Sequence, residues 1–158
     1  MRIMNGIPRR PALAVIGVAI AAFLTLGCLI AKSEAQPSEL QSTRAKQIEE
    51  LVNKAAQLVN AKGSAAFDEF AQKGSQWFKD DTYIFVQDMK GLELFNAAFP
   101  NAVGRNFLDQ KDKNGKLIVR EIHELLQKQD AGWVDYMWPR PSTNEVAKKW
   151  TYIKRAAS

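Results

Sequence analysis

The sequence predicts an α+β domain in which one long helix precedes an antiparallel sheet. Apolar residues recur at three- and four-residue spacing over residues 39–62, which is typical of an amphipathic helix. Residues 132–139 and 148–154 are rich in aromatic and β-branched residues, and Pro, Ser, Thr and Asn are frequent between them, so the two segments predict a hairpin. With 158 residues, of which 46% are hydrophobic, the chain suits one domain with a modest core.

The remaining elements follow from the same kinds of pattern. We expect a second helix from Ser64 that ends between residues 74 and 78, strands over 82–88 and 92–95, and a third helix over 117–128. The irregular stretch 96–116 is long for a simple connection. Loops of this length often cover a binding site, so we expect this one to do so.

The net charge of +5 lies mainly at the N-terminus, because residues 1–35 carry +3 and residues 36–158 carry +2. Nucleic-acid binding needs clustered Lys and Arg on the folded domain, and this distribution does not support it. The single cysteine, Cys28, cannot form a disulfide within the chain, a CxxC pair or a cysteine zinc cluster. The sequence indicates no cofactor.

Residues 1–35 have the three parts of a secretory signal. A basic start is followed by an apolar run over residues 12–31, and Ser33 and Ala35 place small residues at the −3 and −1 positions of a cut. We predict export to the periplasm or another extracytoplasmic space. Retention as a single transmembrane anchor is the first alternative, because the run is about as long as a bilayer is thick. Lipidation at Cys28 is the second. Residues 36–158 would then form one domain outside the cytoplasmic membrane.

Two patterns in the sequence bear on catalysis and metal binding. Placing Gly115 at the sixth position of a calcium loop puts Glu121 at the twelfth, but Gln110 then stands where a carboxylate is required, so an Asp/Asn-Gly turn is favoured. His123 is the only histidine, and no serine or cysteine partner is indicated, so a structural role is favoured. Glycine-rich phosphate loops are absent from the sequence. The sequence therefore indicates a protein that is not an enzyme.

Aromatic side chains with a few polar groups form the strongest candidate site. Side chains alternate along a strand, so Val134, Tyr136 and Trp138 share one face of their segment. Such a face can line a mostly apolar pocket with oriented polar groups. The aromatic candidates are Tyr83, Phe85, Tyr136, Trp138 and Tyr152, and the candidates for binding a carboxylate are Asn96, Arg120 and Lys149. The alternative is that the aromatic stripe is plain core and the lysines form a solvated edge.

The order of motifs along the chain resembles the single Cache domain family, type 2, over about residues 40–155. The motifs are Lys62-Gly63, Ala66-Phe67, Gly74-Ser75-Gln76-Trp77-Phe78, Thr82-Tyr83-Ile84-Phe85-Val86, Gly104-Arg105-Asn106-Phe107, Asp112-Lys113-Asn114-Gly115-Lys116, Gly132-Trp133-Val134-Asp135-Tyr136-Met137-Trp138-Pro139 and Tyr152-Ile153-Lys154. The resemblance implies a PAS-like antiparallel sheet behind a long N-terminal helix. It also implies sensing of a small molecule, often an organic acid, outside the cytoplasmic membrane.

By this resemblance a ligand cavity is bounded by Tyr83, Phe85, Asn96, Phe107, Tyr136, Trp138 and Lys149, with Lys149 as the carboxylate partner. Two departures from the family are apparent. Asn96-Ala97 stands where many relatives have a His-Pro pair. Relatives also continue past the strand that contains Trp150 to Lys154 into a further, central strand, whereas this sequence stops at Ser158. We therefore expect unpaired backbone beside Trp150 to Lys154, or pairing there with another chain.

The function expected from these observations is that of an exported domain that binds a small carboxylate. No kinase or methyl-accepting region follows in this sequence, so a membrane-bound partner would carry the signal, and a homodimer is a further expectation. One alternative is a structural or interaction module without a ligand. The other is a truncated remnant of the input domain of a chemoreceptor or sensor kinase.

Overall fold

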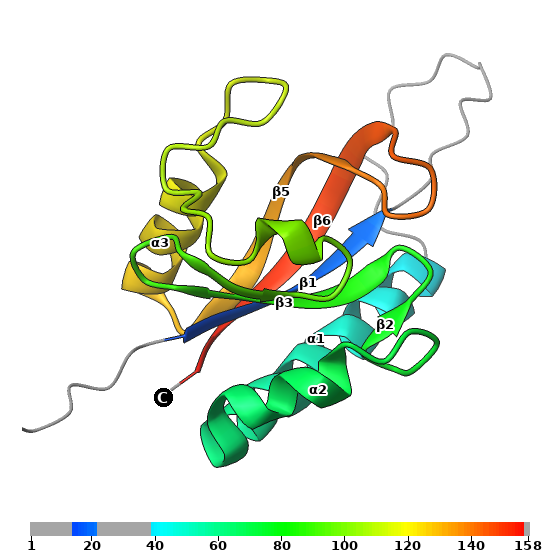
Figure 1. Cartoon of the computed structure of the whole chain (residues 1–158). Helices are drawn as coiled ribbons and strands as arrows, with labels where there is room; N and C mark the ends of the chain where they lie inside the picture. The colour runs from blue at the N-terminus through cyan, green and yellow to red at the C-terminus, as the bar shows by residue number, and fades with distance from the viewer. Residues whose placement is uncertain (1–13, 22–38, 157–158) are drawn as a thin grey trace, which may run out of the picture.

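The computed structural model describes residues 14–21 and 39–156, which form an antiparallel sheet with helices on both faces (Figure 1). The elements in chain order are β1 (Ala14–Ala21), α1 (Glu39–Lys62), η1 (Gly63–Ala66), α2 (Phe67–Phe70), β2 (Phe78–Lys79), β3 (Thr82–Asp88), β4 (Glu93–Asn96), η2 (Pro100–Ala102), α3 (Ile118–Lys128), β5 (Ala131–Pro139) and β6 (Val146–Ala156). The predicted α+β class is confirmed. The predicted bounds agree with α1 and β3, and they differ from those of β4, α3, β5 and β6 by a few residues.

The sheet has six strands, in the order β2-β3-β1-β6-β5, with β4 also paired to β3. Every pairing between these strands is antiparallel. Strand β1 is central and pairs with β6 from Ala14↔Ala156 to Ala21↔Lys149, and with β3 from Ala14↔Asp88 to Val18↔Ile84. The first described strand thus joins the two hairpins, β3–β4 and β5–β6, into one sheet.

The position of β1 corrects the expectation of unpaired backbone beside Trp150 to Lys154. These residues pair with β1 on one side and with β5 on the other. The physical reason is that a short run of small and β-branched apolar residues suits a strand buried on both faces. The periodicity of such a run does not distinguish a buried strand from the apolar core of a secretory signal. Residues 1–13 and 22–35 of the predicted signal, including Cys28, lie outside the described residues, and export remains a prediction.

Gly17 shows how closely β1 fits between its neighbours. An added Cβ atom there would lie 2.5 Å from Cζ of Phe85 and 2.6 Å from Cδ1 of Ile153. Real Cβ atoms do not approach other carbon atoms so closely, so any larger residue would force the Phe85 ring to move. This glycine therefore has a steric role in the centre of the sheet.

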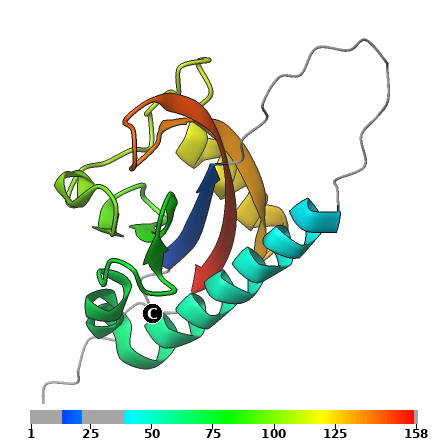
Figure 2. The same cartoon turned by 90° about the vertical axis from the view of Figure 1, so that its right-hand side faces the viewer.

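Helix α1 covers one face of the sheet, as Figure 2 shows from the side. Its buried stripe consists of Ile48, Val52, Ala55, Ala56 and Val59, which belong to the same apolar cluster as Ile84 and Val86 of β3. Nε1 of Trp133 in β5 also donates a hydrogen bond to Oε1 of Glu49, at 2.8 Å. Among the described residues, none of the helices combines the length and the apolar character that a membrane span requires.

The second predicted helix is shorter than expected. Residues 63–66 form the 3₁₀ turn η1, and α2 ends at Phe70. Gly74 has a positive φ of 86°, which L side chains rarely adopt, and the hydroxyl oxygen of Ser75 accepts a hydrogen bond from the backbone N–H of Trp77. These local features end the helical segment and turn the chain into β2. Phe70 is buried and packs edge-on against Trp77.

Candidate ligand-binding site

A small cavity lies on the face of the sheet opposite α1. Its volume is about 40 Å³, and it is lined by Tyr83, Phe85, Gln87, Glu93, Asn96, Ala102, Phe107, Gln110, Ile118, Val119, Ile122, Tyr136, Trp138 and Lys149. The side chains from β3, β5 and β6 all point to this face because residues two apart in a strand share a face. One water molecule needs about 10–15 Å³ of such space, so the cavity has room for roughly three water molecules or a comparably small organic ligand.

Lys149 is the cation of this cavity, and its side chain is only 6% exposed. Its Nζ atom donates a hydrogen bond to the hydroxyl of Tyr83, at 2.5 Å. Four aromatic rings surround the ammonium group, at 4.4 Å for Tyr83, 5.5 Å for Phe85, 5.4 Å for Tyr136 and 5.8 Å for Trp138, measured from Nζ to each ring centroid. The electron-rich faces of such rings stabilise a cation. An ammonium has three N–H donors, so two of them are available beyond the bond to Tyr83.

Burial in this aromatic surrounding changes the acid–base behaviour of the site. Loss of hydration lowers the pKa of Lys149 to about 7, and the nearby Glu93 only partly opposes this effect. Burial also raises the pKa values of the Tyr83 and Tyr136 hydroxyls, so both remain protonated at neutral pH. The hydroxyl of Tyr136 accepts a hydrogen bond from Oγ1 of Thr151, at 3.1 Å. Among Lys149, Tyr83 and Tyr136, it is therefore Lys149 whose charge changes near neutral pH.

A buried carboxyl group, that of Glu93, also lines the cavity. Nε2 of Gln87 donates a hydrogen bond to its Oε2 at 2.5 Å, and Nδ2 of Asn96 donates one to its Oε1 at 2.7 Å. The pairing of β3 with β4 shifts register between Val86 and Gln87, and irregularities of this kind redirect side chains. Burial raises the pKa of Glu93 to about 7, although the two amide donors act in the opposite direction. The cavity thus contains one carboxyl and one ammonium group.

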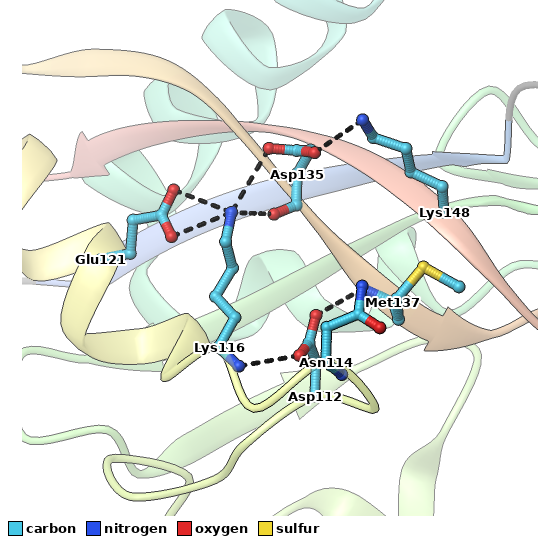
Figure 3. A network of polar contacts seen from close by, with 7 residues as sticks. All are labelled: Asp112, Asn114, Lys116, Glu121, Asp135, Met137 and Lys148. Carbon is cyan, nitrogen blue, oxygen red and sulfur yellow. Dashed lines mark hydrogen bonds and ion pairs between the residues drawn. The ribbon is translucent and has the colours of Figure 1, made fainter.

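The segment between β4 and α3 covers the cavity, and a polar network holds its last part against β5 (Figure 3). The ammonium group of Lys116 donates hydrogen bonds to the backbone oxygen of Asp135 at 2.6 Å and to Oε1 of Glu121 at 3.1 Å. Nζ of Lys148 forms an ion pair with Oδ2 of Asp135, at 2.9 Å. The contacts of Lys116 tie the end of the covering segment and the start of α3 to β5, at the edge of the sheet.

Asp112 fixes the predicted Asp/Asn-Gly turn that precedes α3. Its Oδ1 accepts the backbone N–H groups of Asn114 at 2.8 Å and Lys116 at 2.9 Å, and its Oδ2 accepts that of Met137 at 2.9 Å (Figure 3). Partial burial would raise the pKa of Asp112, but these three bonds outweigh it and lower the pKa. Glu121 is ion-paired with Lys116. In the part of the chain that the structure describes, no cluster of three His, Cys, Asp or Glu side chains suits a metal ion.

The structure brings together seven of the nine residues predicted to bind a ligand: Tyr83, Phe85, Asn96, Phe107, Tyr136, Trp138 and Lys149. Arg120 and Tyr152 lie elsewhere. Arg120 is exposed on α3, where it forms an ion pair with Asp109 at 2.5 Å. Tyr152 lies on the opposite face of β6, with its ring centroid 5.2 Å from that of Trp133. The alternation of side chains along β6 separates Tyr152 from Lys149, because the two positions differ by an odd number.

Sequence reasoning missed two polar residues that line the cavity, Gln87 and Glu93. Gln87 could have been included, because it shares a strand face with Tyr83 and Phe85. Glu93 carried no such signal, since its direction depends on the register shift between β3 and β4. The other missed lining residues are Ala102, Gln110, Ile118, Val119 and Ile122. His123 is half-buried on α3 and is not among the lining residues, and burial lowers its pKa.

Comparisons with curated proteins identify relatives among bacterial receptors. The chain is 26% identical over 151 residues to the methyl-accepting chemotaxis protein McpP of Pseudomonas putida, in an alignment that covers 89% of this chain and 27% of McpP. It is 30% identical over 73 residues to the sensor histidine kinase MctS of Rhizobium johnstonii, covering 46% of this chain and 16% of MctS. The matched part is thus about a quarter or less of the length of these relatives.

Solved structures with a similar fold come from chemosensory proteins. A methyl-accepting chemotaxis protein from Vibrio parahaemolyticus superposes with a TM-score of 0.60 at 22% identity, covering 77% of this chain and 93% of that structure. A Cache chemosensory domain described as recognising carboxylic acids gives a TM-score of 0.59 at 18% identity, covering 78% of this chain and 99% of that domain. The family model for the Cache domain matches residues 30–157. The chain therefore belongs to the Cache domain family.

Proposed function

We propose that this domain is an extracytoplasmic sensor that binds a small carboxylate in the cavity beside Lys149. The observation that carries the proposal is the ammonium group of Lys149, which is buried among four rings and has N–H donors left for a ligand. A carboxylate accepts such charge-assisted hydrogen bonds, which are about twice as strong as neutral ones. The apolar remainder of the lining suits a short hydrocarbon chain.

The relatives support this reading. They include a methyl-accepting chemotaxis protein and a sensor histidine kinase, and a structural neighbour is described as recognising carboxylic acids. Arg120 has no part in this proposal, because it is exposed and ion-paired with Asp109. In the proposed role the domain passes ligand occupancy to a membrane-bound signalling partner, either as a separate protein or as the input part of a longer receptor.

A ligand screen tests the proposal directly. The purified full chain is heated with single compounds from four classes: monocarboxylates of one to four carbons, dicarboxylates, amino acids and neutral sugars. Binding to the native state alone raises Tm, by an amount that grows with ligand concentration above Kd. We expect short monocarboxylates to stabilise the domain and sugars to have no effect. If no carboxylate raises Tm and calorimetry detects no heat of binding, the aromatic face is plain core and the module has another role.

Carboxylate affinity should increase as the pH falls from 8 to 6. Lys149 has a pKa of about 7, so its charged form, which attracts an anion, gains population as the pH falls through this value. Glu93 also has a pKa of about 7 and loses its repulsive charge over the same range. A ligand such as propionate stays ionised throughout. Titration of the lysine alone predicts an affinity gain of about tenfold, measured as Kd by calorimetry. An affinity that is constant or falls toward acid pH would contradict the proposed pairing.

A further inference from the structure

Glu93 is a buried carboxyl group that binding of an unsubstituted carboxylate does not explain. Glu93 is only 2% exposed, and its side chain lines the same small cavity as Lys149. Within residues 14–21 and 39–156, no ion pair joins the two groups. A buried carboxylate is costly unless it is hydrogen-bonded or paired with a cation. A carboxyl group at this place would also repel a ligand made only of a carboxylate and a hydrocarbon chain.

The hydrogen bonds of Glu93 leave room for a further donor. Each of its oxygens accepts one amide N–H, from Gln87 at Oε2 and from Asn96 at Oε1. A carboxylate oxygen can accept two hydrogen bonds, so both oxygens have unused capacity. The two amides also fix the plane of the carboxyl group, because each is held on a different strand. Glu93 is therefore positioned as an acceptor, and its free lone pairs are available to a molecule in the cavity.

The backbone of Glu93 is held as firmly as its side chain. Its N–H donates to the carbonyl of Arg105 at 2.9 Å, and its carbonyl accepts the N–H of Gly104 at 2.8 Å. Among titratable groups, Lys149 on β6 acts to lower the pKa of Glu93, while the charge of Glu93 in turn raises the pKa values of Tyr83 on β3 and Tyr136 on β5. The side chains that α3 contributes to the lining are apolar. Lys149 is thus the one cation among these lining residues that can neutralise either Glu93 or the carboxylate of a ligand.

We propose that Glu93 is a specificity-determining residue that accepts a hydrogen bond from the ligand, so that the cavity prefers small carboxylates that also carry a hydroxyl or ammonium group. The ligand carboxylate binds Lys149, and its donor group binds Glu93. This inference rests on the proposed function. It accounts for both charged groups of the cavity, Lys149 and Glu93, and the volume of about 40 Å³ favours a small ligand. A dicarboxylate is disfavoured, because its second charge would face Glu93.

Three ligands of nearly equal size test the inference: propionate, lactate and alanine, which differ only in a hydrogen, hydroxyl or ammonium group at one carbon. Their Kd values are measured by calorimetry on the full chain at pH 7. We expect lactate or alanine to bind at least about tenfold more tightly than propionate, the effect of one hydrogen bond to a charged group. Preference for lactate alone identifies a hydroxy acid, and preference for alanine alone identifies an amino acid.

The Glu93→Gln variant provides the second measurement, because it keeps the shape and the acceptor oxygen but removes the charge. We expect the preference over propionate to fall at least fivefold for a hydroxy acid and more for an amino acid, while propionate binds as well as or better than before. Equal affinities of wild type for all three ligands, or an unchanged preference in a folded variant, would overturn the inference but leave the proposed function standing. If wild type binds none of the three or any other carboxylate, the proposed function itself fails.

Discussion

Replacing Lys149 with methionine is expected to weaken carboxylate binding about 100-fold. Removing one partner of a buried, hydrogen-bonded charge pair typically costs about 2–5 kcal/mol, and each 1.4 kcal/mol is a factor of ten in Kd. Methionine keeps the unbranched apolar stem that packs among Tyr83, Tyr136 and Trp138, so the cavity walls stay in place. Kd is measured by calorimetry with the ligand that stabilises the wild type most strongly.

Lys148→Met is the matched control. The two lysines are neighbours on β6, but Lys148 points to the other face, where it pairs with Asp135 and is 56% exposed at its side chain. Exposed pairs contribute little, so we expect Kd to change less than about twofold and Tm to stay near that of the wild type. Burial lowers the pKa of Lys149, which means that the fold disfavours its charge, and Lys149→Met should therefore not lower Tm substantially. Equal loss of binding in both variants, or in neither, would contradict the assigned role of Lys149.

Deleting residues 1–35 is expected to abolish the cooperative unfolding transition of the domain. A chain that begins at residue 36 lacks β1, so β3 and β6 face each other across an empty position in the middle of the sheet. The backbone groups that pair with Ala14 to Ala21 lose their partners, and each unsatisfied buried group costs about 1–3 kcal/mol. A typical domain is stable by only about 5–15 kcal/mol in total, so this loss outweighs it. Thermal unfolding followed by circular dichroism measures the effect.

Deleting residues 1–13 is the control for this experiment, because it shortens the N-terminus but retains β1, and it should leave Tm nearly unchanged. In the full chain, Gly17→Val tests the same strand by a point change, since its added carbon atoms collide with Phe85 and Ile153. We expect a lower Tm for this variant. A synthetic peptide of residues 12–23 added to the 36–158 chain should restore part of the transition. If the 36–158 chain unfolds cooperatively at the Tm of the full chain, the central role of β1 is wrong.

The location of β1 also bears on the predicted secretory signal. A cut after Ala35 would remove Ala14 to Ala21, so the same segment cannot be both discarded and the central strand of the exported domain. The mass of the protein recovered from the extracytoplasmic space distinguishes the two fates. A retained N-terminus agrees with the sheet described above, and a cut chain requires that another strand pair with β3 and β6.

The local pattern of apolar and aromatic residues in the sequence determined much of the fold and which aromatic residues share a strand face. The spacing of apolar residues predicted α1, and the alternation along each strand pairs Tyr83 with Phe85 on one face of β3 and Tyr136 with Trp138 on one face of β5. These properties depend on residues a few positions apart, so the sequence alone contains them. The same rule, applied strictly to β6, would have excluded Tyr152 from the site.

Only the tertiary structure decided which strand completes the sheet and that the carboxyl group of Glu93 lies in the cavity with Lys149. An apolar run such as residues 14–21 suits a buried strand, a signal or a membrane helix equally well, and its partners here are far away in sequence. Glu93 reaches the cavity because the β3–β4 register shifts, and Lys149 acquires its low pKa because four rings from β3 and β5 exclude water. Register and burial arise from contacts between distant segments, which a reading of neighbouring residues cannot supply.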